Sequence, residues 1–97
     1  MIVRDGVYYL RSPDALWRAT AEEVIVASAG GEEYELLSAT AAAVWRLLAQ
    51  PMSIGDLSDR LAADFGEEPG RIEADVEPLL GWLADRGLVQ IVADGDD

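Results

Sequence analysis

Residues 33–48 read EYELLSATAAAVWRLL, and the spacing of the apolar residues changes within this stretch. Before Leu37, apolar residues come in short runs with a period near two, which is typical of strands. After Leu37, they recur with a period near 3.6, which is typical of amphipathic helices. The stretch therefore predicts a strand that leads directly into a helix, with a sheet-forming part before it and a helical part after it.

Three runs in the first part predict an N-terminal antiparallel sheet, with strands at residues 16–20, 24–28 and 33–37. The middle strand is the strongest of these predictions, because three β-branched residues follow one another in it. A glycine pair at 30–31 supplies the positive φ angles of a tight hairpin turn. Residues 7–10 are a possible further strand, which the sequence leaves open.

Two predicted helices follow the third strand. The first begins near Ser38 or Thr40, because either hydroxyl can cap a helix N-terminus. The second begins at a capping box in which Ser53 is followed three residues later by Asp56. Gly66 is a suitable terminator for this helix, since glycine readily adopts the left-handed conformation found at helix ends.

A third helix is predicted over residues 71–86, and a short terminal strand over residues 88–92. Pro78 conflicts with this helix, because an interior proline removes a backbone hydrogen bond and costs about 3 kcal/mol. Either the helix kinks near Ala74, or residues 71–77 form a separate turn and Pro78 starts the helix proper. We favour the kinked helix, because the apolar stripe continues across the proline.

The order of these elements predicts an α+β fold, in which an N-terminal antiparallel three-stranded sheet is followed by three helices. This arrangement resembles a winged helix-turn-helix. A chain of 97 residues allows one domain with one modest core. We expect that domain to span residues 1–92, with residues 93–97 as an acidic tail.

The composition excludes many kinds of chemistry, because the chain has no cysteine, histidine, lysine or asparagine. Disulfides, zinc or iron–sulfur ligation, cysteine or histidine catalysis and lysine Schiff bases are all ruled out. Only carboxylates remain as metal ligands, and those around Gly66 do not match the spacing of an EF-hand loop. We expect no cofactor and no metal site.

The charge balance points to one class of partner. Nineteen acidic residues against seven arginines give a net charge of −12, which repels nucleic acid and anionic membrane surfaces and favours basic peptides or proteins. No apolar run approaches the roughly 18 residues of a membrane span. The first residues, which include charged ones, do not resemble a signal peptide, so a cytoplasmic location is expected.

The sequence predicts neither catalytic activity nor sequence-specific DNA binding. Glu73 and Glu77 lie four apart on the third helix, but on the side away from its apolar stripe, which is typical of a solvated face. The serines have no histidine or lysine to act as a base. The same helix carries Arg71 and Arg86 against four carboxylates, whereas a recognition helix normally carries several basic or amide residues.

The three tryptophans have different predicted roles. Trp45 lies on the apolar stripe of the first helix and is expected in the core. Trp17 lies in a strand near a sheet edge, so that core and contact surface are both open. Trp82 lies off the main stripe of the third helix. It either covers the edge of the core or forms the aromatic wall of a peptide groove.

Three segments carry a family resemblance. They are Tyr34-Glu35-Leu36-Leu37-Ser38-Ala39-Thr40-Ala41-Ala42-Ala43-Val44-Trp45-Arg46-Leu47-Leu48, then Ser53-Ile54-Gly55-Asp56-Leu57 with Leu61 and Phe65-Gly66, and then Asp75-Val76 with Leu79, Leu80 and Leu83 followed by Arg86-Gly87-Leu88-Val89. In this order and spacing, over roughly residues 8–92, the chain resembles the PqqD-like family. These are small domains that bind the leader peptides of ribosomally synthesised and post-translationally modified peptides (RiPPs). Ser38 stands where many members carry asparagine, and it preserves the capping role.

The resemblance implies a non-catalytic adaptor that binds a precursor's leader as an added strand along residues 33–37, in a groove against helix 71–86. The implied partners are the leader peptide and either a peptide-modifying enzyme or a leader peptidase. The strand would contribute Glu33, Tyr34, Glu35, Leu36 and Leu37, and the helix would contribute Arg71, Asp75, Val76, Leu79 and Trp82. The apolar lining would be Tyr34, Leu36, Val76, Leu79 and Trp82, and the charged rim would be Glu33, Glu35, Arg71 and Asp75.

Two other functions stay open on the sequence. One is a winged-helix transcription regulator, against which the net charge argues. The other is a structural or dimerisation module that uses the same strand edge on itself, and nothing in the sequence excludes it.

The composition generates a first testable prediction. Because transition metals prefer the histidine and cysteine ligands that the chain lacks, we expect the purified protein to carry no stoichiometric metal. Elemental analysis of the purified chain measures this directly. One equivalent of a transition metal per chain would contradict the prediction.

Overall fold

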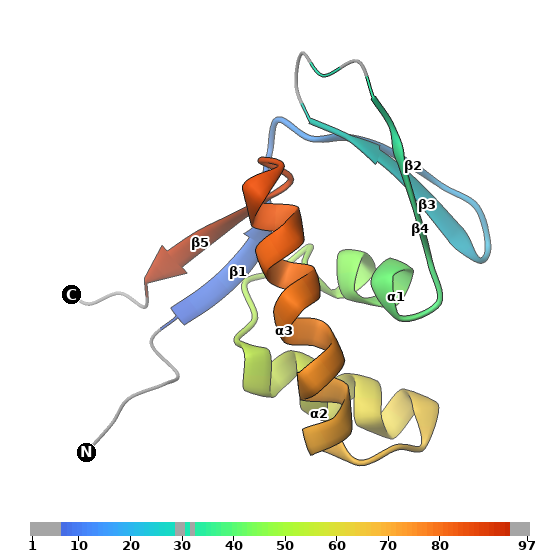
Figure 1. Ribbon diagram of the computed structural model, residues 1–97, viewed down its shortest axis with the longest axis vertical. Helices are drawn as coiled ribbons and strands as arrows, with labels where there is room; N and C mark the ends of the chain where they lie inside the picture. Colours follow the sequence, from blue (N-terminus) through green and yellow to red (C-terminus); the bar gives the residue numbers. More distant parts are fainter. Residues whose placement is uncertain (1–6, 29–30, 32, 94–97) are drawn as a thin grey trace.

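The computed structural model describes residues 7–28, 31 and 33–93 (Figure 1). The elements in chain order are β1 (Val7–Arg11), β2 (Leu16–Ala19), β3 (Glu23–Ala27), β4 (Glu35–Ser38), α1 (Thr40–Leu47), α2 (Ile54–Phe65), α3 (Pro69–Asp85) and β5 (Val89–Ala93). The expected α+β class with three helices is confirmed. Residues 94–97 of the expected acidic tail and the first glycine of the expected hairpin turn lie outside the described residues.

The strands form two antiparallel sheets instead of one. β2, β3 and β4 lie side by side in that order, whereas β1 pairs with β5 along its whole length. The possible strand at residues 7–10 is therefore present, but it lies outside the three-stranded sheet. Tyr9 also exchanges two backbone hydrogen bonds with Met52, of 2.8 and 3.0 Å between nitrogen and oxygen, which fix this second sheet to the loop before α2.

The third strand of the larger sheet differs from the expected span of 33–37. It begins at Glu35 and continues to Ser38, so Glu33 and Tyr34 precede it. The shift has a physical cause in the pairing with β3, which starts at Glu23 and supplies a partner for each residue of β4 through Ser38.

The core lies between the three helices and the inner face of the β2–β3–β4 sheet (Figure 1). Its largest fully buried side chains are Trp45, Leu48, Leu57, Leu61, Leu80, Leu83, Leu88, Val24, Val26, Val44 and Val76. The expected position of Trp45 in the core is confirmed. Trp17 of β2 is 45% exposed and meets Trp45 edge-on, with ring centroids 6.1 Å apart. Trp17 thus belongs partly to the core and partly to the surface.

Arg11 of β1 joins the two sheets through these rings. Its guanidinium carbon lies 4.5 Å from the ring centroid of Trp17 and 5.6 Å from that of Trp45, which is the geometry of a cation–π interaction. Partial burial lowers the pKa of the Arg11 guanidinium below its usual value.

The start of α1 differs from the sequence-based expectation. Ser38 still belongs to β4 and Thr40 is already the first helical residue, so neither is the N-cap. Ala39 occupies that position with φ 52° and ψ −125°, and no side chain caps the helix. The chain turns from strand to helix within one residue, in a backbone conformation that favours glycine.

α2 begins and ends as expected. The backbone nitrogen of Asp56 donates to Oγ of Ser53 at 3.0 Å, and the backbone nitrogen of Ser53 donates to Oδ2 of Asp56 at 3.4 Å. These two bonds form the predicted capping box. At the other end, Gly66 has φ 70° and donates its backbone N–H to the carbonyl of Ala62, which confirms it as the terminator.

α3 is one helix from Pro69 to Asp85, longer at its start than the expected 71–86, and Pro78 lies inside it. The alternative of a separate turn before Pro78 is therefore wrong. Pro78 is exposed, so the carbonyl that loses its helical partner lies on the water-facing side of the helix. Gly87, with φ 74°, follows the helix end as expected.

No helix among the described residues has both the length and the apolar character needed to cross a membrane.

The backbone of Ala39 generates a second prediction. Ala39→Gly should raise the free energy of unfolding by about 1 kcal/mol, because the relieved strain exceeds the entropy that glycine loses on folding. Thermal denaturation should show a rise in Tm of about 4–8 °C. The control is Ala43→Gly inside α1, which should lower the stability by about 1 kcal/mol. Equal destabilisation by both variants would contradict the proposed strain.

Candidate functional site

The candidate site begins with the backbone of β4. This strand is the last in the order β2–β3–β4, so among the described residues its other side has no strand beside it. Its side chains alternate as predicted: Leu37 is 3% exposed and points into the core, whereas Leu36 is 59% exposed on the opposite face. An extended peptide would find an unpaired row of backbone donors and acceptors there.

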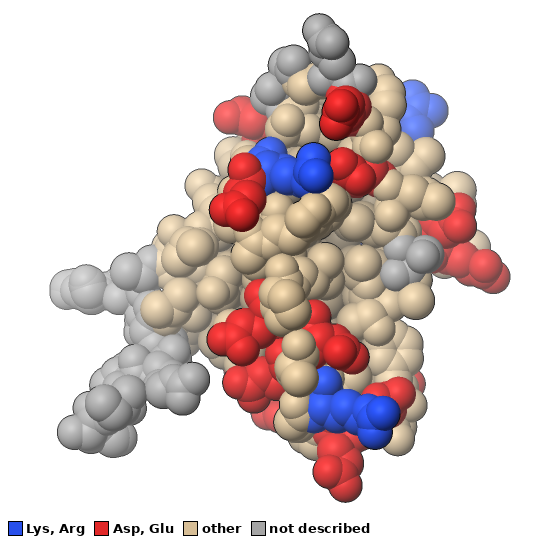
Figure 2. All heavy atoms as spheres, viewed as in Figure 1, with Lys and Arg blue, Asp and Glu red and all other residues tan. Residues whose placement is uncertain are grey.

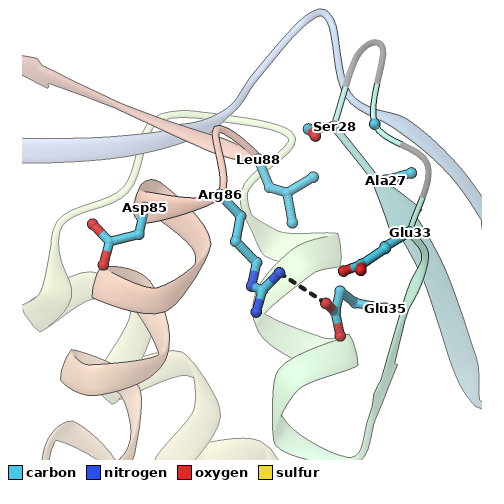
Figure 3. Close-up of a pocket in the computed structure, with 8 residues that line it drawn as sticks. Ala27, Ser28, Glu33, Glu35, Asp85, Arg86 and Leu88 are labelled. Atoms are coloured by element: carbon cyan, nitrogen blue, oxygen red, sulfur yellow. Dashed lines mark ion pairs between the residues drawn. The ribbon is translucent and has the colours of Figure 1, made fainter.

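A hollow of about 550 Å³ lies between β4, the end of β3 and the C-terminal end of α3 (Figure 3). It is lined by Ala27, Ser28, Gly31, Glu33, Glu35, Asp85, Arg86 and Leu88. Ala27 and Leu88 are almost fully buried and give it apolar walls, while the carboxylates and Arg86 give it a charged rim. Asp85 borders the hollow, but its side chain points away to the other side of α3 (Figure 3).

Arg86 connects the two sides of this hollow. Its Nη1 lies 3.0 Å from Oε2 of Glu35 on β4 (Figure 3). Its guanidinium carbon lies 4.6 Å from the ring centroid of Trp82 on α3. The side chains of Arg86 and Glu35 are 43% and 29% exposed, so solvent screens the pair. An ion pair of this kind contributes about 0–1 kcal/mol.

The structure brings only two of the predicted strand residues to this hollow, namely Glu33 and Glu35. Tyr34 and Leu36, which were expected to line a groove against the helix, lie on the outer face of the sheet instead. Tyr34 is 72% exposed and borders a second hollow of about 330 Å³, together with Leu16, Trp17, Arg18 and Ile25. Leu36 is the register partner of Ile25 and shares this outer face.

The predicted helix residues are also divided. Val76 is fully buried in the core, whereas Leu79 and Trp82 are partly buried against it and remain accessible. Arg71 and Asp75 are exposed near the start of α3, and Arg71 lies 3.9 Å from Glu67. A rise of 1.5 Å per residue places Arg71 about 22 Å from Arg86 along the helix. Arg71 and Asp75 therefore do not border the hollow.

Sequence reasoning missed Arg86 and Leu88 as site residues. Both stand in one of the segments that carry the family resemblance, and Arg86 follows Trp82 by four residues, which places the two on one helix face. This four-residue spacing at the end of the helix is the feature of the sequence that indicated Arg86 as a neighbour of Trp82.

Acidic side chains gather over α2 and the lower part of α3 (Figure 2). No group of three or more carboxylates among the described residues is arranged to hold a metal ion. The hollow can offer ion pairs, hydrogen bonds and apolar contact to a ligand, together with the backbone of β4.

Comparison with known proteins gives one family and two structural neighbours. The family model described as coenzyme PQQ synthesis protein D (PqqD) matches residues 23–89, from the start of β3 to the start of β5. No curated protein sequence matches the chain.

The first structural neighbour is TbiB1 in complex with the TbiA(beta) leader peptide. It has a TM-score of 0.74 and 20% sequence identity, over 84% of this chain and 94% of that one. The second is the PqqD truncation of Methylobacterium extorquens PqqCD, described as a functional and stand-alone RiPP recognition element. It has a TM-score of 0.70 and 19% identity, over 86% of this chain and 88% of that one.

At these identities the two neighbours share the fold with the chain. The family model spans more than two thirds of the sequence, including the edge strand and the whole of α3. The chain belongs to the PqqD family.

Proposed function

We propose that the chain is a non-catalytic adaptor that binds the leader region of a precursor peptide and presents it to a maturation enzyme. The observation that carries this proposal is the unpaired edge of β4 beside the hollow at the end of α3. Membership of the PqqD family supports it, as do two neighbours of the same fold, one in complex with a leader peptide and one described as a recognition element.

The proposed mode of binding is strand addition to β4. Each main-chain hydrogen bond contributes about 0.5–1.5 kcal/mol net and fixes the register of the peptide. These bonds do not read sequence, so specificity must come from side chains on the two faces of the strand. A total of about −8 kcal/mol, equivalent to a micromolar Kd, is within reach of several such bonds and one apolar contact.

The partners under this proposal are the precursor's leader and a peptide-modifying enzyme or leader peptidase. Catalysis would rest with that enzyme, because the hollow pairs carboxylates with an arginine and the chain has no histidine, cysteine or lysine. A cytoplasmic location, where a ribosomally made precursor would be met, is part of the same proposal.

We also propose that residues 1–92 act as one domain, with a winged helix-turn-helix-like arrangement of α1, α2, α3 and the β2–β3–β4 sheet. The short connection between α1 and α2 and the packing of α3 against α2 support it. Such a fold often binds DNA, but acidic side chains gather over α2 and the lower part of α3 (Figure 2), which opposes contact with phosphates. Titration against a pool of leader peptides and a pool of DNA duplexes separates the two functions.

Strand addition generates the third prediction, tested with Glu35→Pro and Leu36→Pro. Successive residues of a strand direct their N–H groups to opposite sides, so one of these two prolines removes a donor to β3 and the other a donor to the peptide. We expect one variant to keep its helical circular dichroism and its Tm while leader affinity falls about tenfold, which equals roughly 1.4 kcal/mol. If both folded variants bind leader peptides like the parent, the ligand is not an added strand.

The two neighbouring leucines of α3 generate the fourth prediction. Leu80 is 1% exposed, and Leu80→Ala should cost about 2–5 kcal/mol of stability in urea denaturation. Leu79 is only partly buried, so Leu79→Ala should cost clearly less and leave a folded protein for peptide titration. Equal losses of stability would show that Leu79 is core and unavailable to a ligand.

A further inference from the structure

The two faces of β4 differ in chemistry, and this difference specifies what kind of peptide the strand accepts. On the outer face, Leu36 is 59% exposed and Tyr34, just before the strand, is 72% exposed. On the other face, Glu35 borders the hollow at the end of α3, together with Glu33. Apolar and acidic side chains thus alternate along this edge.

The outer face continues as an apolar surface across the sheet. Leu36 is opposite Ile25, which is 45% exposed, and Ile25 is in turn opposite Arg18 of β2. Leu16 and Tyr34 complete the border of the hollow on this face, and none of the described residues that line it is a carboxylate. In a chain with 19 acidic residues, the described lining of this hollow has one basic and no acidic side chain, and the exposed Glu23 lies farther along β3, opposite Ser38.

The hollow on the inner side has a different character. Buried Leu88 and Ala27 form apolar walls below a rim of carboxylates. Glu35 is already engaged by Arg86 at 3.0 Å, whereas Glu33 is exposed and makes no ion pair with any of the described residues. The position next to Glu33 therefore favours a cation whose aliphatic stem can lie on the apolar walls.

We propose that the leader segment bound along β4 alternates apolar or aromatic residues with a basic residue. Its apolar side chains lie beside Leu36 and Tyr34 on the outer face, and its basic side chain enters the hollow beside Glu33. The inference rests on the proposed strand addition and specifies the peptide class. It follows from the period of two in a strand, which sends successive side chains of an added peptide to these two faces.

Charge identifies a foreign peptide, and not a second copy of this chain, as the occupant. Two β4 strands paired edge to edge would bring Glu33 and Glu35 of one copy close to those of the other, and like charges opposite one another are destabilising. A basic side chain at the same place is attracted to Glu33, and the net charge of −12 adds to that attraction.

The test compares three synthetic peptides of equal length by fluorescence anisotropy. In the first, valine and arginine alternate; the second has the same composition with the valines in one block and the arginines in another; in the third, valine and glutamate alternate. We expect the first to bind about tenfold more tightly than the second, which controls for non-specific attraction of arginine to an acidic protein. The third should bind more weakly than either.

Variants of the protein test which face of β4 contacts the apolar side chains of the peptide and which contacts the basic ones. Leu36→Thr should weaken binding of the alternating valine–arginine peptide about threefold, because a cross-strand apolar contact is lost. Leu16→Thr is the matched control: Leu16 is 61% exposed on the same face, but it lies on β2, the edge strand opposite β4. Glu33→Gln should weaken binding about threefold at low salt and reduce its salt dependence, whereas Glu77→Gln on the exposed side of α3 should not.

The outcomes separate this inference from the proposed function. If the block peptide binds as tightly as the alternating one, while a proline in β4 abolishes the binding of both, strand addition holds. The inference that the bound peptide alternates apolar and basic residues is then wrong. If Leu16→Thr weakens binding as much as Leu36→Thr, the ligand covers the whole outer face, and the inference is again wrong. If no peptide responds to the prolines, the proposed strand addition to β4 itself fails.

Discussion

Burial of the Trp45 ring is the interaction on which the rest of the structure depends. Trp45 is fully buried in α1, meets Trp17 of β2 edge-on, and lies under the guanidinium of Arg11 from β1. One side chain therefore contacts both sheets. The position of β4 follows from this support, because β4 is paired to β3 on one side and continues into α1 through the single residue Ala39.

The opposite side of β4 is held by a much weaker contact. Across the hollow, the ion pair of Arg86 with Glu35 joins the strand to the end of α3, and both side chains are partly exposed. Its contribution of about 0–1 kcal/mol is smaller than that of two main-chain hydrogen bonds to an added strand. The site is therefore firm where it is anchored to the core and easily rearranged where a ligand would enter.

The sequence predicted best those features that depend on neighbouring residues. The capping box of Ser53 and Asp56 and the terminating Gly66 depend on hydrogen bonds within a few positions, and all are present. The N-cap of α1 was predicted wrongly, because pairing with β3 keeps Ser38 in the strand, and that pairing is not visible from local propensity.

The residues of the candidate site were likewise predicted only as far as local sequence determines them. The alternation of Leu36 and Leu37 was readable as a period of two, but which helix lies across from which face depends on packing between distant segments. Tyr34 was therefore placed in the wrong surroundings, and Arg86 was missed because its partner Glu35 belongs to another element.

The pairing of β1 with β5 has a consequence for how this domain can be joined to other proteins. Val7 lies opposite Ala93, so the two ends of the described chain meet, and Figure 1 shows them on the other side of α3 from the β2–β3–β4 sheet. A polypeptide that continues from Val7 or Ala93 therefore starts on that side, away from β4. The same closeness of the ends suits the fold to circular permutation, with a short linker joining β5 to β1.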